Sequence, residues 1–93
     1  MKLTDRLATS DDVVCRQVGG ETVLMDIASG TYFGLDAVGA RVWQLIEDDQ
    51  CTLLETCDRI GAEYDVARAD LEHDVLALAA QLVEHGLAAK AGE

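Results

Sequence analysis

The sequence predicts a two-layer α+β fold, in which a three-stranded antiparallel meander packs against three helices. Residues 13–35 alternate between apolar and polar side chains and are divided by glycine-containing turns, as consecutive strands are. From residue 37 onward, apolar side chains recur at helical spacing instead. Because 49% of the residues are apolar, we expect a single domain spanning residues 1–93, with loosely ordered ends at 1–10 and 89–93.

Three strands are expected ahead of the first helix. Residues 13–18 have β-branched side chains at both ends, and the glycine pair that follows supplies a two-residue hairpin turn. The second strand begins at Glu21 and shows period-two alternation as far as Ile27. Gly30 tolerates the positive φ of the next turn, and the β-branched and aromatic segment Thr31–Leu35 forms the third strand.

Capping residues mark the first two helices. Asp36 occupies an N-cap position, and the helix after it is expected to run to about residue 47. Thr52 and Glu55 form a T-x-x-E capping box at the start of the second helix, which is expected to stop at Gly61.

The third helix is expected to be capped by Asp65 and terminated by Gly86. Its inner stripe recurs at intervals of four, three and four residues: Leu71, Val75, Leu78 and Leu82. Three helices of this spacing also suit a winged-helix-like arrangement.

The net charge of −11, from 18 acidic and 7 basic residues, argues against nucleic acid as a partner, because so acidic a surface repels phosphate. The helix that would read DNA in a winged-helix protein has only Arg68 as a base among four carboxylates. The acidity favours solubility or a basic partner.

Nothing in the sequence directs the chain to a membrane. The longest apolar run, Val75–Ala80, is far too short to span a bilayer, and residues 1–12 contain no signal-peptide core. Three cysteines without a C-x-x-C pair fit reduced thiols, so we expect a cytoplasmic protein.

No set of residues predicts catalysis, a metal site or a cofactor. His73 and His85 both fall outside the apolar stripe of the third helix and are expected to face solvent. Cys57 reads as a small buried hydrophobe, and Cys51 is expected to be exposed. The competing interpretation is a thiol-dependent enzyme that uses Cys51 or Cys15.

The segment Thr31–Leu35 predicts a binding function, because it has no charge and no proline to protect a sheet edge. At an edge it would accept a peptide as an added strand, whereas as an inner strand it would only place Tyr32 or Phe33 in the core. The helical wheel leaves open which flank of the third helix would line such a site. One flank carries Asp70, Asp74, Gln81 and His85, and the other carries Leu76, Ala79, Ala80 and Val83.

The chain resembles the PqqD-like family, also called RiPP recognition elements, over nearly its whole length, residues 6–88. The matching pieces are Arg6-Leu7-Ala8, the stretch GTYFGLDAVGARVW at 30–43, Glu63-Tyr64-Asp65-Val66, Asp74-Val75, Leu82 and Gly86-Leu87. Each is weak alone, but their order and spacing together are fairly specific.

This resemblance implies a winged-helix-like β3α3 domain that binds the leader of a ribosomally made precursor peptide and presents it to modifying enzymes. The leader would add beside the third strand, in a groove against the third helix. The implied peptide-binding residues are Thr31, Tyr32, Phe33, Gly34, Leu35, Leu71, Asp74, Val75 and Leu78.

The stretch at 30–43 is most similar to the free-standing proteins of lasso-peptide clusters, whose partners are a leader-cleaving cysteine protease and a cyclase. The alternative within the family is a peptide chaperone for pyrroloquinoline quinone synthesis, working with a radical SAM enzyme. Such chaperones usually carry Cys-Asp-Gly where this chain has Glu47-Asp48-Asp49. An acidic winged-helix scaffold and a homodimer formed through the strand edge are further alternatives.

Overall fold

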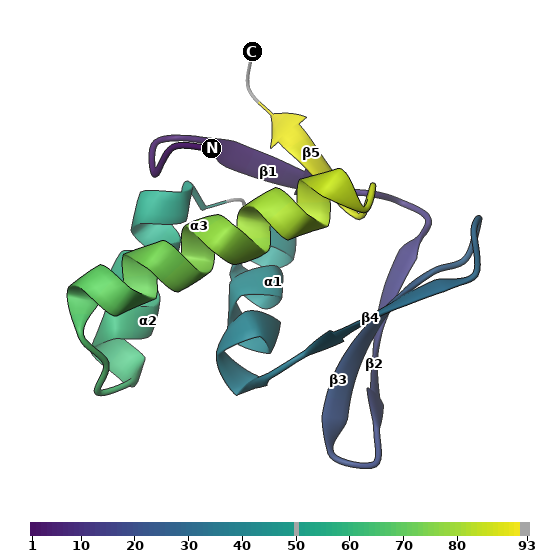
Figure 1. Ribbon diagram of the computed structural model, residues 1–93, viewed down its shortest axis with the longest axis horizontal. Helices are drawn as coiled ribbons and strands as arrows, with labels where there is room; N and C mark the ends of the chain where they lie inside the picture. Colours follow the sequence, from purple (N-terminus) through teal and green to yellow (C-terminus); the bar gives the residue numbers. More distant parts are fainter. Residues whose placement is uncertain (50, 92–93) are drawn as a thin grey trace.

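The structure, a computed structural model, describes residues 1–49 and 51–91 of the chain. Helices and strands follow in the order β1 (Arg6–Thr9), β2 (Val13–Val18), β3 (Glu21–Asp26), β4 (Thr31–Leu35), α1 (Ala37–Asp49), α2 (Leu53–Glu63), α3 (Arg68–Glu84) and β5 (Ala88–Ala91). Figure 1 shows the β2–β3–β4 sheet projecting to one side of the three helices. The predicted α+β class and its core of three strands and three helices are confirmed.

Strands β2, β3 and β4 form the predicted antiparallel meander, in the order β2-β3-β4. Gly19 and Gly20 have φ values of 60° and 87°, the left-handed geometry that a two-residue hairpin turn requires. The register pairs Leu24 with Phe33, so that both side chains lie on the face of the sheet that packs on the core. Strand β4 therefore lies at an edge, and no further strand of the described residues pairs with it.

The predicted start signals of α1 and α2 are present. The Asp36 carboxylate accepts a hydrogen bond from the backbone N–H of Gly39 at 2.7 Å. At α2, the Thr52 hydroxyl accepts from the N–H of Glu55 at 3.1 Å, while the Glu55 carboxylate accepts from the N–H of Thr52 at 2.8 Å. These reciprocal bonds satisfy backbone donors that the first turn of a helix leaves unpaired.

Two predicted helix boundaries are wrong. Helix α2 continues through Gly61 to Glu63, because Gly61 keeps helical geometry and the chain turns only at Tyr64. Helix α3 begins after Ala67, which offers no side-chain cap, so Asp65 does not cap it. The predicted end of α3 is confirmed, since the helix stops at Glu84 and Gly86 follows with a φ of 74°.

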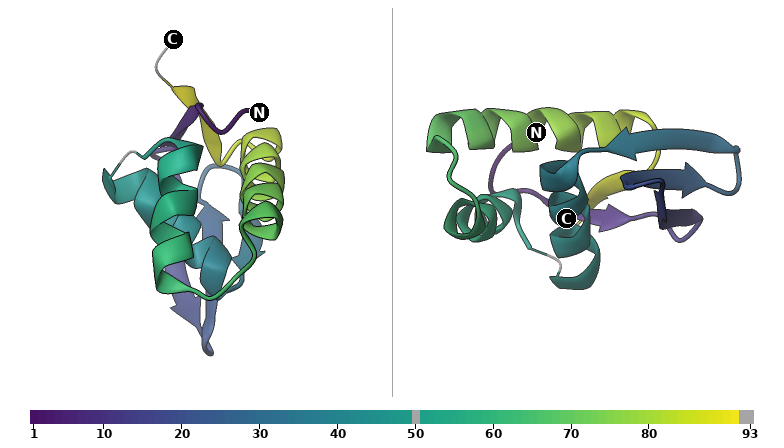
Figure 2. Two further views of the ribbon diagram at one scale, coloured as in Figure 1. Left: turned by 90° about the vertical axis from the view of Figure 1, so that its left-hand side faces the viewer. Right: turned by 90° about the horizontal axis from the view of Figure 1, so that it is seen from below.

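A second, two-stranded sheet pairs β1 with β5, in a register that runs from Arg6 opposite Ala91 to Thr9 opposite Ala88. Residues 6–9 and 89–91, which were expected to belong to loosely ordered ends, are thus paired in a sheet, and residues 92–93 lie outside the described part of the chain. Figure 2 shows β1 and β5 side by side near the C-terminal end of α3. Leu7 of β1 is 2% exposed, which makes this sheet part of the core.

The core contains Trp43 of α1, Leu53 and Ile60 of α2, and Leu82 of α3. Cys57 is buried, as predicted, but Cys51 is also buried, which corrects the expectation that it is exposed. It lies just before α2, where the neighbouring backbone is tied to β1 by a bridge between Arg6 and Thr52. Within the described residues, no helix has the length and apolar character needed to cross a bilayer.

Candidate peptide-binding groove

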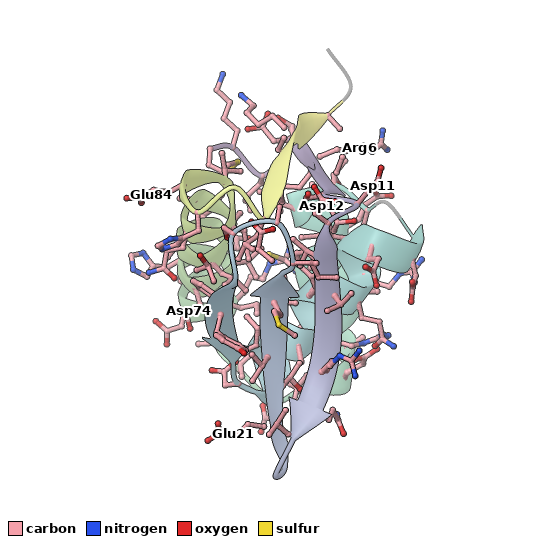
Figure 3. All side chains as sticks on the ribbon, turned by 90° about the vertical axis from the view of Figure 1, so that its right-hand side faces the viewer. Arg6, Asp11, Asp12, Glu21, Asp74 and Glu84 are labelled. Carbon is pink, nitrogen blue, oxygen red and sulfur yellow. The ribbon has the colours of Figure 1, made fainter. Side chains whose placement is uncertain are left out.

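A pocket of about 630 Å³ opens between β4, the first turn of α1 and one flank of α3. In Figure 3, β4 is the strand of the sheet nearest to α3. The pocket gathers seven of the nine predicted site residues, namely Phe33, Gly34, Leu35, Leu71, Asp74, Val75 and Leu78. Thr31 and Tyr32 do not line it. We call this pocket, together with the open edge of β4, the groove.

The floor of the groove is apolar. Leu35, Leu71 and Val75 are buried, while Val38 and Leu78 are half-buried and present part of their side chains to the pocket. Leu78 was expected within the inner stripe of α3, but Ala79 takes the fully buried position there. An apolar ligand side chain placed on this floor would remove apolar surface of both the ligand and the protein from contact with water, which is favourable.

The flank of α3 that lines the groove is the one with Asp70, Asp74 and Gln81. On the opposite flank, Leu76 and Val83 pack against the core. The structure thus decides between the two flanks that the helical wheel left open. His85 lies beyond the groove, where its ring centroid is 5.5 Å from that of Phe33.

The register of the sheet indicates which backbone groups of β4 are open. The two-residue turn makes Val18 and Glu21 a hydrogen-bonded pair, and such pairs alternate along antiparallel strands. Leu24 and its partner Phe33 therefore direct their backbone groups toward each other. Tyr32 and Gly34, one residue to either side of Phe33, direct their N–H and C=O groups to the edge. That edge can accept a peptide strand.

Gly34 leaves this edge sterically open. No atom lies within 4 Å of the place that a Cβ would occupy there. By contrast, a Cβ at Gly39 in the first turn of α1 would lie 3.1 Å from Asp36 Oδ1 and 3.3 Å from Leu35 Cδ2. Glycine at position 39 lets α1 start directly against the end of β4, and this close approach forms the third wall of the groove.

The rim of the groove carries negative charge. Asp36, Asp70 and Asp74 line it, and none of the described residues around the pocket is basic. Arg68, at the start of α3, is engaged elsewhere. Its Nη2 lies 2.8 Å from Asp58 Oδ1 and its Nε lies 2.8 Å from Glu72 Oε2.

Sequence reasoning missed the contribution of α1 and of the segment before α3. Val38, Gly39 and Val42 line the groove from α1, and Val66 and Ala67 line it from the connection to α3. One feature of the sequence could have predicted the contribution of α1. The Asp36 cap follows β4 without a loop, and this forces the first turn of α1 to lie beside the strand.

Two of the three thiols, those of Cys15 and Cys57, have raised pKa values. Cys15 lies at the surface, but partial desolvation, and to a smaller extent the charge of Glu47, raise its pKa above the ordinary value. Burial likewise raises the pKa of Cys57. Both groups therefore stay protonated near neutral pH, whereas the thiolate is the reactive form. Among the described residues, no three His, Cys, Asp or Glu side chains converge as metal ligands would.

The fold and the groove together define a winged-helix-like β3α3 protein with an apolar pocket beside an open strand. The sequence profile of the family described as "Coenzyme PQQ synthesis protein D (PqqD)" matches residues 21–88, and the chain belongs to this family. No curated protein sequence matches significantly.

Two solved structures resemble this one closely. The first is described as "TbiB1 in Complex with the TbiA(beta) Leader Peptide"; it is 37% identical, with a TM-score of 0.78, and the match covers 92% of this chain and 99% of that one. The second is "Lasso peptide synthetase B1 complexed with the leader peptide", at 29% identity and a TM-score of 0.78, covering 89% of this chain and 96% of that one.

Proposed function

We propose that this chain is a non-catalytic recognition protein that binds the leader segment of a ribosomally synthesised precursor peptide. The leader adds as a strand to the edge of β4 and places apolar side chains on the floor of the groove. The observation that carries this proposal is the position of an apolar pocket directly beside the outward backbone groups of Tyr32 and Gly34. Both similar structures are complexes with leader peptides, which supports it.

The groove offers enough interaction energy for a specific but reversible complex. Each backbone hydrogen bond made at the edge contributes about 1 kcal/mol net. Each apolar side chain buried on the floor contributes roughly 1.5–3 kcal/mol. Ordering a flexible peptide offsets a good part of that sum, so we expect micromolar or somewhat tighter affinity.

We assign the protein to the cytoplasm, where it would present the leader to maturation enzymes of the lasso-peptide type, a leader protease and a cyclase. The resemblance to the two B1 structures favours this pathway. The second candidate is a peptide chaperone in pyrroloquinoline quinone synthesis, which the description of the family favours. The neighbouring genes distinguish the two, because only the first predicts a precursor gene beside a protease and a cyclase.

The test compares two leucines of α3. Leu76 and Leu78 are both half-buried on the same helix, but only Leu78 lines the groove. With fluorescently labelled TbiA(beta) leader peptide as the probe, we expect Leu78→Ser to weaken binding by about tenfold or more, since it removes an apolar contact worth roughly 1.5 kcal/mol. Leu76→Ser should bind like the wild type.

Circular dichroism of both variants accompanies the titration. Equal binding by the two folded variants, or no binding of the leader by the wild type, would contradict the proposal. A second copy of the chain is the competing occupant of the β4 edge. Sedimentation should therefore show that any dimer formed without peptide dissociates when the leader is added.

A further inference from the structure

The negative charge of the groove is concentrated at one end. Asp36 directly follows β4, and Asp70 and Asp74 lie one turn apart in the first half of α3. At the other end the groove is bounded by the neutral side chains of Gln81 and Phe33. A peptide lying along β4 would therefore meet the carboxylates beside Leu35 and none beside Thr31.

Two of these carboxylates have no partner in the described part of the chain. Asp70 and Asp74 are both exposed, and neither takes part in a hydrogen bond or ion pair among residues 1–49 and 51–91. The opposite flank of α3 is different, because Glu72 is paired with Arg68. The groove-facing acids are thus left available, and Figure 3 shows Asp74 on the part of α3 that runs beside the sheet.

An apolar segment alone would be a poor fit to this end of the groove. Covering Asp70 and Asp74 with apolar groups would remove water from two carboxylates without replacing their hydrogen bonds, which is unfavourable. A Lys or Arg side chain of the peptide would supply those bonds and neutralise the charge. Because the chain carries a net charge of −11, such a peptide would also be attracted over a longer range.

We propose that the groove selects leader peptides with a Lys or Arg near the apolar side chain that occupies the pocket, at the end of the peptide strand that lies beside Leu35 and Asp36. This inference rests on the proposed function and specifies the chemistry of its ligand. The acidic rim acts as a specificity element, not merely as a solubilising surface.

The experiment selects from a display library of random-sequence peptides long enough to span β4. Three immobilised proteins are compared: the wild type, the double variant Asp70→Asn/Asp74→Asn, and the control Glu84→Gln. Glu84 is an exposed carboxylate of the same helix that does not line the groove. The amide substitutions keep side-chain size and remove only charge, so the fold should be unaffected.

For the wild type and for Glu84→Gln, we expect enriched peptides to combine an apolar residue with a Lys or Arg at one side of it. For the double variant, the apolar preference should remain and the basic preference should disappear. A synthetic copy of an enriched peptide should bind the double variant about three- to tenfold more weakly than the wild type, and this difference should shrink at high salt.

The possible failures are distinct. Enriched apolar peptides without Lys or Arg, or a basic preference that survives in the double variant, would overturn this inference and leave peptide binding intact. If no peptide is enriched on the wild type at all, the proposed function itself is wrong.

Discussion

The two sheets of this protein are both short and antiparallel, yet they differ in how far the rest of the protein covers them. The β2–β3–β4 sheet ends in β4, whose edge faces the groove and carries no charged side chain. The β1–β5 sheet lies against the helices and buries Leu7 and Ala88. The comparison shows that one sheet is covered by helices while the other keeps an uncharged edge beside an apolar pocket, and the proposed function gives a reason for leaving that edge uncovered.

The largest expected effect is on the free energy of unfolding and concerns the β1–β5 sheet. Leu7→Ala removes a side chain that is 2% exposed and should lower the free energy of unfolding by about 2–5 kcal/mol. Leader affinity, measured at a temperature where the variant is folded, should not change. Leu54→Ala, at a leucine that is 40% exposed, is the control and should have a much smaller effect in urea unfolding. A large loss of affinity in Leu7→Ala would show that the two sheets are not separable in function.

The next effect concerns binding. Gly34→Pro removes a backbone donor that points to the open edge, so leader binding should fall by about fivefold or more, because one or more hydrogen bonds of about 1 kcal/mol are lost. Proline is tolerated on an edge strand, so the sheet should remain folded. Isothermal titration calorimetry and circular dichroism measure the two effects.

Two further variants serve as controls for Gly34→Pro. Gly34→Ala keeps the N–H group and should bind like the wild type. Phe33→Pro removes a donor that points to β3 and should disrupt the sheet itself. If Gly34→Pro binds the leader normally while Phe33→Pro is folded and does not bind it, the assignment is wrong: the N–H of Phe33, and not that of Gly34, then points to the open edge.

The smallest effect is electrostatic and lies at the β1–β5 sheet. A hydrogen bond from the backbone N–H of Lys2 at 2.8 Å, and beyond it the ammonium of Lys90 at 3.6 Å, hold the pKa of Asp5 below its ordinary value of 3.8. A lowered pKa in the folded state means that the charged form stabilises the protein above the ordinary pKa and that this contribution is lost as the pH falls through the folded-state pKa.

Asp5→Asn should therefore be less stable than the wild type near neutral pH, and the difference should shrink as the pH falls below 3.8. Urea unfolding at several pH values measures it, with leader affinity near neutral pH as the control. A difference that is constant with pH would show that the Asp5 carboxylate does not act through its charge.

The same comparison explains how much of the fold was predictable. The meander could be predicted because its turns are local, with two glycines between β2 and β3 and Gly30 between β3 and β4. The pairing of β1 with β5 joins Thr9 to Ala88, and nothing in either segment resembles a strand pattern. Such non-local pairing depends on the packing of the helices between the two segments.

The groove was predictable in part for a related reason. The strand side followed from the uncharged Thr31–Leu35 and from the resemblance, and the floor residues of α3 were implied by the resemblance alone. The wall that α1 provides was missed, although the Asp36 cap directly after β4 already required the first turn of α1 to lie beside the strand. The burial of Cys51 was missed likewise, since it results from the contact of the α2 start with β1.

The pairing of β1 with β5 also has a topological consequence. Arg6 lies opposite Ala91, so the two ends of the folded body leave it as neighbours, and Arg6 is also bridged to Thr52 just before α2. The acidic end of the groove lies by the N-terminal half of α3. Neither strand of this pair lines the groove, so protein engineering could join a further domain at either end, in either order, through a sheet that contributes no residue to the groove.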